Sequence, residues 1–215
     1  LTSMSTGYER ALSLHRGRFN EDNLKLVPFL IREEAFSVPR DKALNRRKLG
    51  FDENKFTVVL AEGGYGIGKM QKICEKAIER DLPVTLVPIC GKNEKLYAYL
   101  KGLKTKGNLD FRPQGFVGDI FTYLAAADLF CGKSGASMMA EPCFFGVPVI
   151  ITKYATKIER LIGEYYTDAV KSAIKEFDPG KVVDLILPPT PNFYSRTAPP
   201  PNRNAAITDR RKPRG

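Results

Sequence analysis

One stretch of the chain combines residue types that could hold a charged ligand. Residues 130–151 read FCGKSGASMMAEPCFFGVPVII, where an apolar run ends at Lys133 and a carboxylate, Glu141, follows in an otherwise apolar segment. An apolar run that ends in small polar residues is typical of a strand that leads through a turn into a helix. Such a glutamate either lies on a solvated helix face or accepts hydrogen bonds from a ligand, and the residues alone leave both alternatives open.

A second stretch, EGGYGIGKM at residues 62–70, is rich in glycine and follows another apolar run. Glycines let backbone amides approach a phosphate, and the N-terminus of a following helix favours negative charge. Gly63, Gly68 and Lys69 have the spacing of a P-loop, but Met70 stands where that motif has the serine or threonine that holds Mg²⁺. A P-loop-like nucleotide switch is therefore one hypothesis for this turn.

Two further readings of the same turn remain. Gly64, Gly66 and Gly68 give G-x-G-x-G, which differs from the G-x-G-x-x-G spacing that is typical of dinucleotide binding. The turn is also compatible with a diphosphate-binding loop that uses no metal ion, or with a tight strand-to-helix turn that binds nothing.

The elements that must position these residues alternate along the chain. Continuously apolar runs predict buried strands, and helical segments between them predict a parallel sheet covered on both faces. The expected strands are 24–30, 56–62, 82–90, 109–116, 127–132, 147–153 and 167–173. The expected helices are 4–17, 39–49, 68–80, 93–105, 120–126, 134–145, 156–164 and 179–187. The fold class is therefore α/β, a doubly wound, Rossmann-like parallel sheet, whose ligands bind beyond the carboxyl ends of the strands.

Length and charge limit the alternatives. The 215 residues are 43% hydrophobic and 27% charged, which suits one domain with appendages, and no apolar run reaches the length of about 18 residues that a membrane span needs. Half of the net charge of +10 lies in residues 188–215, a proline-rich basic segment that we expect to be disordered. A basic surface suits an anionic membrane, whereas arginines interleaved with aromatic residues, as for nucleic acid, are not found.

The cysteines predict neither disulfides nor a metal site. None belongs to a C-x-x-C pair, all four lie in apolar surroundings, and the single histidine cannot build a metal cluster. We expect buried free thiols in a reducing compartment. The four cysteines are Cys74, Cys90, Cys131 and Cys143.

Three segments together resemble the C-terminal, donor-binding half of the family 28 glycosyltransferases, which are two-domain GT-B enzymes that act on peptidoglycan precursors and diacylglycerol. The segments are LAEGGYGIGK, GFVGDIFTYLAAADLFCGKSGASMMAEPCFFGVPVII and, more loosely, LVPFLIREEAF with RRKLGFDENKFTVVLAEGG. Their order follows the family pattern over about residues 24–153. The combination is specific, although no single piece is.

The resemblance implies a role for each residue of a UDP-sugar site. Glu141 would accept hydrogen bonds from the ribose hydroxyls, since a carboxylate can accept two at once. The start of its helix, with Lys133, would face the diphosphate, and Phe116-Val117 would lie where backbone groups contact uracil. The implied donor-binding residues are Gly63, Gly64, Gly66, Phe116, Val117, Lys133, Ser134, Gly135, Ala136, Ser137, Glu141 and Glu159. No metal ion or other cofactor is expected.

The chain departs from the family pattern at three places. Pro142 follows Glu141 inside the expected helix, where we expect a kink. Glu62 adds a negative charge beside the expected phosphate position. After the strand at 147–153, Glu159 is only a loose counterpart of the family's sugar-contacting pair.

The resemblance also predicts the domain organisation. Residues 1–23 are expected to be a remnant of an N-terminal acceptor domain or an interdomain helix, 24–187 a nucleotide-sugar-binding domain, and 188–215 a disordered tail. Because the family's N-terminal domain binds the acceptor and supplies the base, we expect no catalytic residue here and no transfer by this chain alone. The expected partners are a UDP-sugar, the acceptor domain or a separate subunit, and an anionic membrane at its cytoplasmic face. The expected reaction moves a hexosyl group to a lipid or membrane-linked acceptor; the alternatives are the P-loop-like switch over Gly63–Lys69 and a scaffold.

Overall fold

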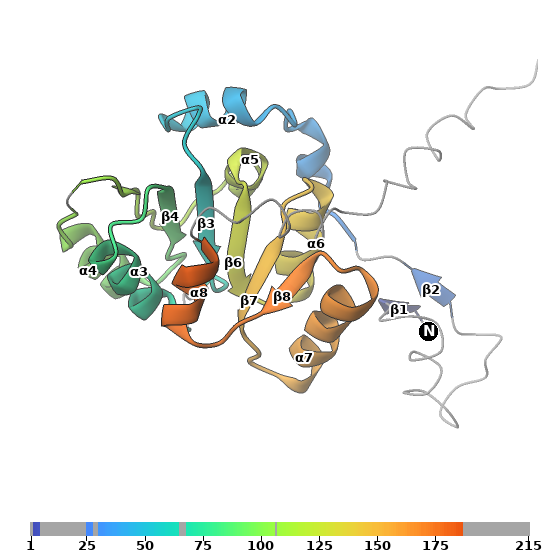
Figure 1. Ribbon diagram of the computed structural model, residues 1–215. Helices are drawn as coiled ribbons and strands as arrows, with labels where there is room; N and C mark the ends of the chain where they lie inside the picture. Colours follow the sequence, from blue (N-terminus) through green and yellow to red (C-terminus); the bar gives the residue numbers. More distant parts are fainter. Residues whose placement is uncertain (1, 5–24, 28–29, 65–67, 106, 187–215) are drawn as a thin grey trace, which may run out of the picture.

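The computed structural model describes residues 2–4, 25–27, 30–64, 68–105 and 107–186, and a parallel sheet lies at its centre (Figure 1). The strand order is β5-β4-β3-β6-β7-β8, which confirms the expected doubly wound α/β fold. The strands are β3 (Thr57–Ala61), β4 (Thr85–Ile89), β5 (Asp110–Phe111), β6 (Leu129–Lys133), β7 (Val149–Lys153) and β8 (Ala173–Lys175). Every residue of β3 and β4 is buried, as expected for strands that are covered on both faces.

Helices α2 to α8 lie close to the ranges expected from the sequence, and at four of them a capping residue marks the start. Asp41, Asn93, Asp119 and Thr156 each accept a hydrogen bond from a backbone amide in the first turn of the helix that follows. The helices are η2 (Glu33–Ser37), α2 (Lys42–Leu49), α3 (Met70–Glu79), α4 (Glu94–Gly102), α5 (Ile120–Ala126), α6 (Ala136–Phe144), α7 (Lys157–Glu164) and α8 (Pro179–Ile186). The short helix η2 was not expected.

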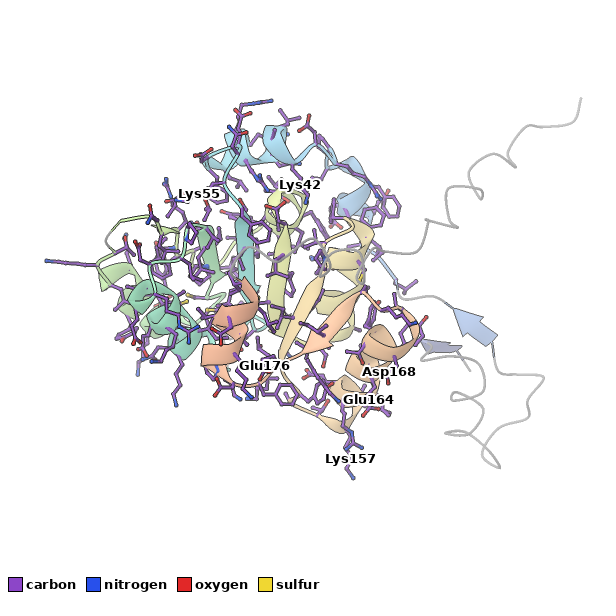
Figure 2. The ribbon with its side chains drawn as sticks, viewed as in Figure 1. Lys42, Lys55, Lys157, Glu164, Asp168 and Glu176 are labelled. Atoms are coloured by element: carbon purple, nitrogen blue, oxygen red, sulfur yellow. The ribbon has the colours of Figure 1, made fainter. Side chains whose placement is uncertain are left out.

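Two apolar clusters cover the two faces of the sheet. One cluster joins the sheet to α3, α4 and α8, and the other joins it to α2, α5, α6 and α7. Polar contacts add to the second: Lys42, labelled in Figure 2, and Arg46 reach from α2 to the carboxylate of Asp128 at the start of β6. The same carboxylate accepts the backbone amide of Thr57 in β3 at 2.9 Å, so it joins α2 to two central strands.

The strand order reverses between β3 and β6, and the two backbones are close at this point. A Cβ atom added to Gly132 would overlap the carbonyl oxygen of Ala61 in β3. The register between β6 and β7 also shifts between Gly132 and Lys133. Glycine at position 132 therefore allows the two central strands to end side by side, where a doubly wound fold binds its ligand.

The glycine-rich turn after β3 is held by a buried carboxylate. Glu62 accepts the backbone amides of Lys69 and Met70, both at 2.9 Å, and the hydroxyl of Thr152 at 3.0 Å. It thus satisfies amides of the first turn of α3, which otherwise lack partners, and links them to β7. This contact explains why a glutamate stands beside the glycine-rich turn, which the sequence did not reveal.

Some expectations need correction. An edge strand was expected at 167–173, but residues 165–169 form a π-helical turn, η3 (Tyr165–Ala169), and the strand begins at Ala173. Tyr166 is buried in the second apolar cluster, which keeps the chain helical there, and Lys171 then takes a left-handed conformation with φ 55°. The strand expected at 109–116 is reduced to β5, with one further bridge between Gln114 and Ile89.

The N-terminal segment forms a separate pair of strands. β1 (Thr2–Met4) pairs in parallel with β2 (Lys25–Val27), outside the six-stranded sheet, and Met4 therefore lies in a strand where a helix was expected. The remainder of the expected helix 4–17, Gly66 and the expected tail 188–215 lie outside the described residues. No helix in the described part of the chain is long and apolar enough to cross a membrane.

We predict that Gly132→Ala destabilises the protein by about 1–3 kcal/mol, because the added methyl group must push β3 and β6 apart. Urea unfolding followed by circular dichroism measures this change. Gly102→Ala is the matched control, since a Cβ atom there meets nothing within 4 Å and α4 gains a better helix former. Equal stability of the two variants would contradict the close approach of the strands.

We also predict that Glu62→Gln lowers the free energy of unfolding by about 1–2 kcal/mol, because its amide group places a donor against one of the two backbone amides. Glu79→Gln, at an exposed position at the end of α3, should leave the unfolding midpoint unchanged. An unchanged midpoint for Glu62→Gln would show that the cap contributes nothing measurable.

Candidate functional site

The carboxyl ends of β3, β6 and β7 bring several predicted residues together. Gly63, at φ 84°, lies against Lys133 so closely that a Cβ atom there would come within 2.8 Å of the lysine Cε atom. Only glycine fits both this backbone conformation and this contact. The turn after β3 and the end of β6 are therefore in direct contact.

Glu159, at the start of α7, joins the same group. Its Oε1 accepts Lys133 Nζ at 2.6 Å, and its Oε2 accepts the amide of Ala155 at 2.8 Å. The buried hydroxyl of Ser134 donates to the backbone carbonyl of Glu159 at 2.7 Å. The carboxylate and the Ser134 hydroxyl are thus engaged within the protein, and they fix α7 against the end of β6.

The N-terminus of α6 is built differently from those of α4, α5 and α7. Its N-cap is Gly135, which has an extended conformation and no side chain that could accept a hydrogen bond. Ala136 opens the helix, and Ser137 in the first turn is exposed. First-turn amides that lack a side-chain cap, with the positive end of the helix dipole, suit an anionic ligand.

Glu141 is buried in α6 and forms a bidentate ion pair. Both of its oxygens accept hydrogen bonds from Arg32, from Nε at 2.9 Å and from Nη2 at 3.2 Å. The Arg32 guanidinium also lies over the ring of Phe121 in α5, 4.5 Å from its centroid, and the bonds to Glu141 raise the pKa of Arg32. The helix α6 continues through Pro142. The proline that was expected to kink this helix therefore leaves Glu141 within it.

Arg32 is a partner of Glu141 that the sequence did not predict. It is the N-cap of η2 and lies 109 positions before Glu141. A single arginine in a segment that also carries Glu33 and Glu34 gives no signal of its own. Only the packing of this segment against α5 and α6 brings the guanidinium to the carboxylate.

The predicted base-contacting segment lies between β5 and α5. The side chain of Phe116 is 69% exposed, which excludes a simple core role for it. Val117 is partly buried and packs against the same apolar cluster as Phe121. The segment thus lies just before α5, the helix that carries Phe121, whose ring contacts Arg32.

In the described part of the P-loop-like turn, the amides at the start of α3 are not free to bind a phosphate. Glu62 already accepts the amides of Lys69 and Met70, and a phosphate in that place would meet its carboxylate. The Lys69 ammonium donates to the carbonyl of Phe177 instead of pointing into the turn. A Cβ atom at Gly68 would overlap the Glu62 carboxylate, so this glycine serves the cap.

A cavity of about 340 Å³ lies on the other face of the sheet, between α3 and α4. Apart from Gly68, its lining residues belong to none of the motifs singled out from the sequence. They are Gly68, Gln71, Asn93, Lys95, Leu96 and Tyr99.

The four cysteines are free, as expected, and Cys74, Cys90 and Cys131 are buried. Burial raises the pKa of Cys90 and of Cys143 to about 11, so both thiols are protonated at neutral pH. Within the described ranges, histidine, cysteine, aspartate and glutamate side chains form no group of three that could hold a metal ion.

Comparisons with known proteins agree with this architecture. Residues 68–171 match the family model of the glycosyltransferase family 28 C-terminal domain. The chain is 27% identical over 154 residues to monogalactosyldiacylglycerol synthase 1 of Arabidopsis thaliana, which covers 68% of this chain and 28% of that protein. It is 29% identical over 143 residues to the processive diacylglycerol beta-glucosyltransferase of Bacillus pumilus, covering 66% of this chain and 36% of the relative.

Solved structures show the same fold at low sequence identity. The MurG structure from Acinetobacter baumannii has a TM-score of 0.61 at 13% identity and covers 97% of this chain and 65% of that one. Arabidopsis thaliana UGT89C1, solved with UDP, has a TM-score of 0.62 at 13% identity, covering 88% and 49%. The chain spans about a third of the length of the two curated relatives. Residues 68–171 are thus similar to the C-terminal domain of the family 28 glycosyltransferases, and the chain has the fold of solved glycosyltransferase structures.

Proposed function

We propose that this domain binds a UDP-sugar as the donor half of a glycosyltransferase. The observation that carries the proposal is the position of Glu141, a buried carboxylate on the helix whose uncapped N-terminus follows β6. A carboxylate that accepts two donors suits a cis-diol, and Arg32 already demonstrates that both oxygens can be used together. The ligand's ribose would bind at Glu141 and its diphosphate at the start of α6.

The charges near α6 support the same orientation. Lys133 ends the strand before the helix, and its ammonium lies close to Gly63 in the turn after β3. Together with the first-turn amides, it would stabilise the negative charge that develops on UDP as the sugar leaves. The exposed Phe116 and its neighbour Val117 would lie beside the uracil, and Gly64 and Glu159 would complete the surroundings of the diphosphate and the sugar.

The reaction follows from the donor chemistry. An acceptor hydroxyl would attack the anomeric carbon of the sugar, the bond to the diphosphate oxygen would break, and the hydroxyl proton would pass to a base. The proposal places this base and the acceptor site outside the described residues, in a further domain or a separate subunit, so this chain alone would transfer nothing. It requires no metal ion, because amides and Lys133 supply the positive charge.

The names of the relatives and the separate strand pair support this arrangement. The relatives are named as synthases and transferases of diacylglycerol glycolipids, which makes a lipid or membrane-linked acceptor the preferred class. Two strands are too few for a stable sheet, so β1 and β2 suit the edge of a larger sheet that other residues complete. Peripheral attachment to the cytoplasmic face of an anionic membrane is part of the same proposal.

The proposed donor site leads to a prediction about Glu141. Calorimetric titration of the 215-residue chain with UDP should show binding without Mg²⁺, and Glu141→Gln should weaken it about tenfold or more, because charge-assisted hydrogen bonds are lost. Glu53→Gln is the matched control, because it removes the carboxylate of an exposed ion pair with Arg47. It should leave the affinity for UDP unchanged. Circular dichroism establishes that each variant is folded.

Three other results of this titration would contradict the proposal or a part of it. Equal UDP affinity of wild type and Glu141→Gln would remove Glu141 from the site. Binding of ATP or GTP only with Mg²⁺, lost in Lys69→Ala, would instead support the P-loop-like switch. No binding of any nucleotide by the folded chain would contradict the proposed donor site.

A further prediction separates binding of the diphosphate from binding of the nucleoside. Lys133→Met should weaken UDP binding about tenfold but leave uridine binding unchanged, because the ammonium is proposed to contact only the diphosphate. Lys153→Met, at the end of the neighbouring strand β7, is the control for the lost surface charge. An equal loss for UDP and uridine would place Lys133 in a purely structural role with Glu159.

A further inference from the structure

The Arg32–Glu141 pair places an internal cation on the carboxylate that is proposed to bind ribose. The Arg32 side chain is 53% exposed, whereas that of Glu141 is 6% exposed. The solvent-exposed part of the pair is therefore the guanidinium, whereas the carboxylate is covered. Both carboxylate oxygens are already in use, each by a different nitrogen of the guanidinium.

The guanidinium presents the same donor pattern as a ribose diol. Nε and Nη2 are two adjacent donors that point in one direction, as two neighbouring hydroxyls of a ribose do. A carboxylate that is almost fully buried has little room for a second pair of donors while the first remains. Arginine and diol would thus compete for Glu141.

The surroundings of Arg32 allow it to leave. Its side chain packs on one ring, that of Phe121, and is otherwise half exposed, so its charge can be solvated when the pair opens. The buried carboxylate of Glu141 needs a partner, so the pair can open only when the ligand's donors replace those of Arg32. The released guanidinium would remain near the ligand, because Arg32 is the N-cap of η2.

We propose that Arg32 is a positioning residue of the donor site that occupies Glu141 in the free protein and is exchanged for the ribose diol when the nucleotide binds. The inference rests on the proposed function, because it needs Glu141 to accept the ribose. It assigns to Arg32 a selective role: only a ligand with a diol replaces the two hydrogen bonds that Glu141 loses. A nucleotide without the diol would leave the Arg32–Glu141 pair closed.

The test compares UDP with 2′,3′-dideoxy-UDP on wild type and Arg32→Ala, by calorimetry of the full 215-residue chain. Arg32→Ala should bind UDP about two- to fivefold more tightly than wild type, because the competing ion pair is gone. The affinity for the dideoxy nucleotide should not rise, since that ligand never competes for Glu141. A residue that only supports the fold would shift the two affinities together.

Arg40→Ala is the matched control. Its guanidinium also lies over an aromatic ring, 4.4 Å from the centroid of Phe144, and the segment 30–40 contains both arginines. Removing it should change neither affinity. Arg32→Lys, which keeps the charge but not the two adjacent donors, should fall between wild type and Arg32→Ala.

Each outcome separates the exchange from the donor site itself. UDP binding by wild type that weakens in folded Arg32→Ala would overturn the exchange and leave the proposed function intact. UDP binding by Arg32→Ala where wild type shows none would support the exchange strongly. No UDP binding by either folded protein would overturn both proposals.

Discussion

A single buried carboxylate, that of Glu62, joins three elements that the rest of the site depends on. Glu62 directly follows β3, accepts two backbone amides at the start of α3, and accepts a hydrogen bond from the hydroxyl of Thr152 in β7. Unsatisfied amides at a buried helix start are costly, so this contact fixes where α3 begins relative to the sheet. The position of Gly63, one residue further, follows from it.

The same region shows three buried glutamates with three different partners. Glu62 accepts backbone amides, Glu159 holds Lys133 and an amide of its own loop, and Glu141 holds Arg32. In each case burial requires a partner, because an unpaired buried carboxylate is strongly unfavourable. The partners differ in how easily they can leave. Amides of a packed helix stay in place, whereas the half-exposed side chain of Arg32 can be replaced by a ligand.

This difference explains why two turns with similar sequence signals differ in their suitability for binding a phosphate. The glycine-rich turn looked more like a phosphate site, yet its helix is capped by Glu62. The turn before α6 has fewer glycines, yet Gly135 leaves the helix start without a side-chain acceptor. Phosphate binding depends on whether amides are free, and this depends on contacts between distant segments rather than on glycine count.

Much of the fold was predictable, since buried parallel strands are continuously apolar and capping residues mark helix starts. The helix at Ile120–Ala126 matched its expected range because Asp119 is an evident cap. The π-helical turn at Tyr165–Ala169 was missed, because the burial of Tyr166 against the sheet overrides a local pattern that suggested a strand. The length of β5 was also overestimated, since the residues that follow it pair with the sheet only at one isolated bridge, between Gln114 and Ile89.

The sequence by itself determined the fold class, the family resemblance and the prominence of Glu141, because apolar periodicity and ordered motifs are local properties. The tertiary structure alone decided what each charged group contacts. The partners of Glu62 and Glu141 include Thr152 and Arg32, which lie 90 and 109 positions away in the chain. Contacts at such separations are set by how the layers pack, and no local pattern encodes them.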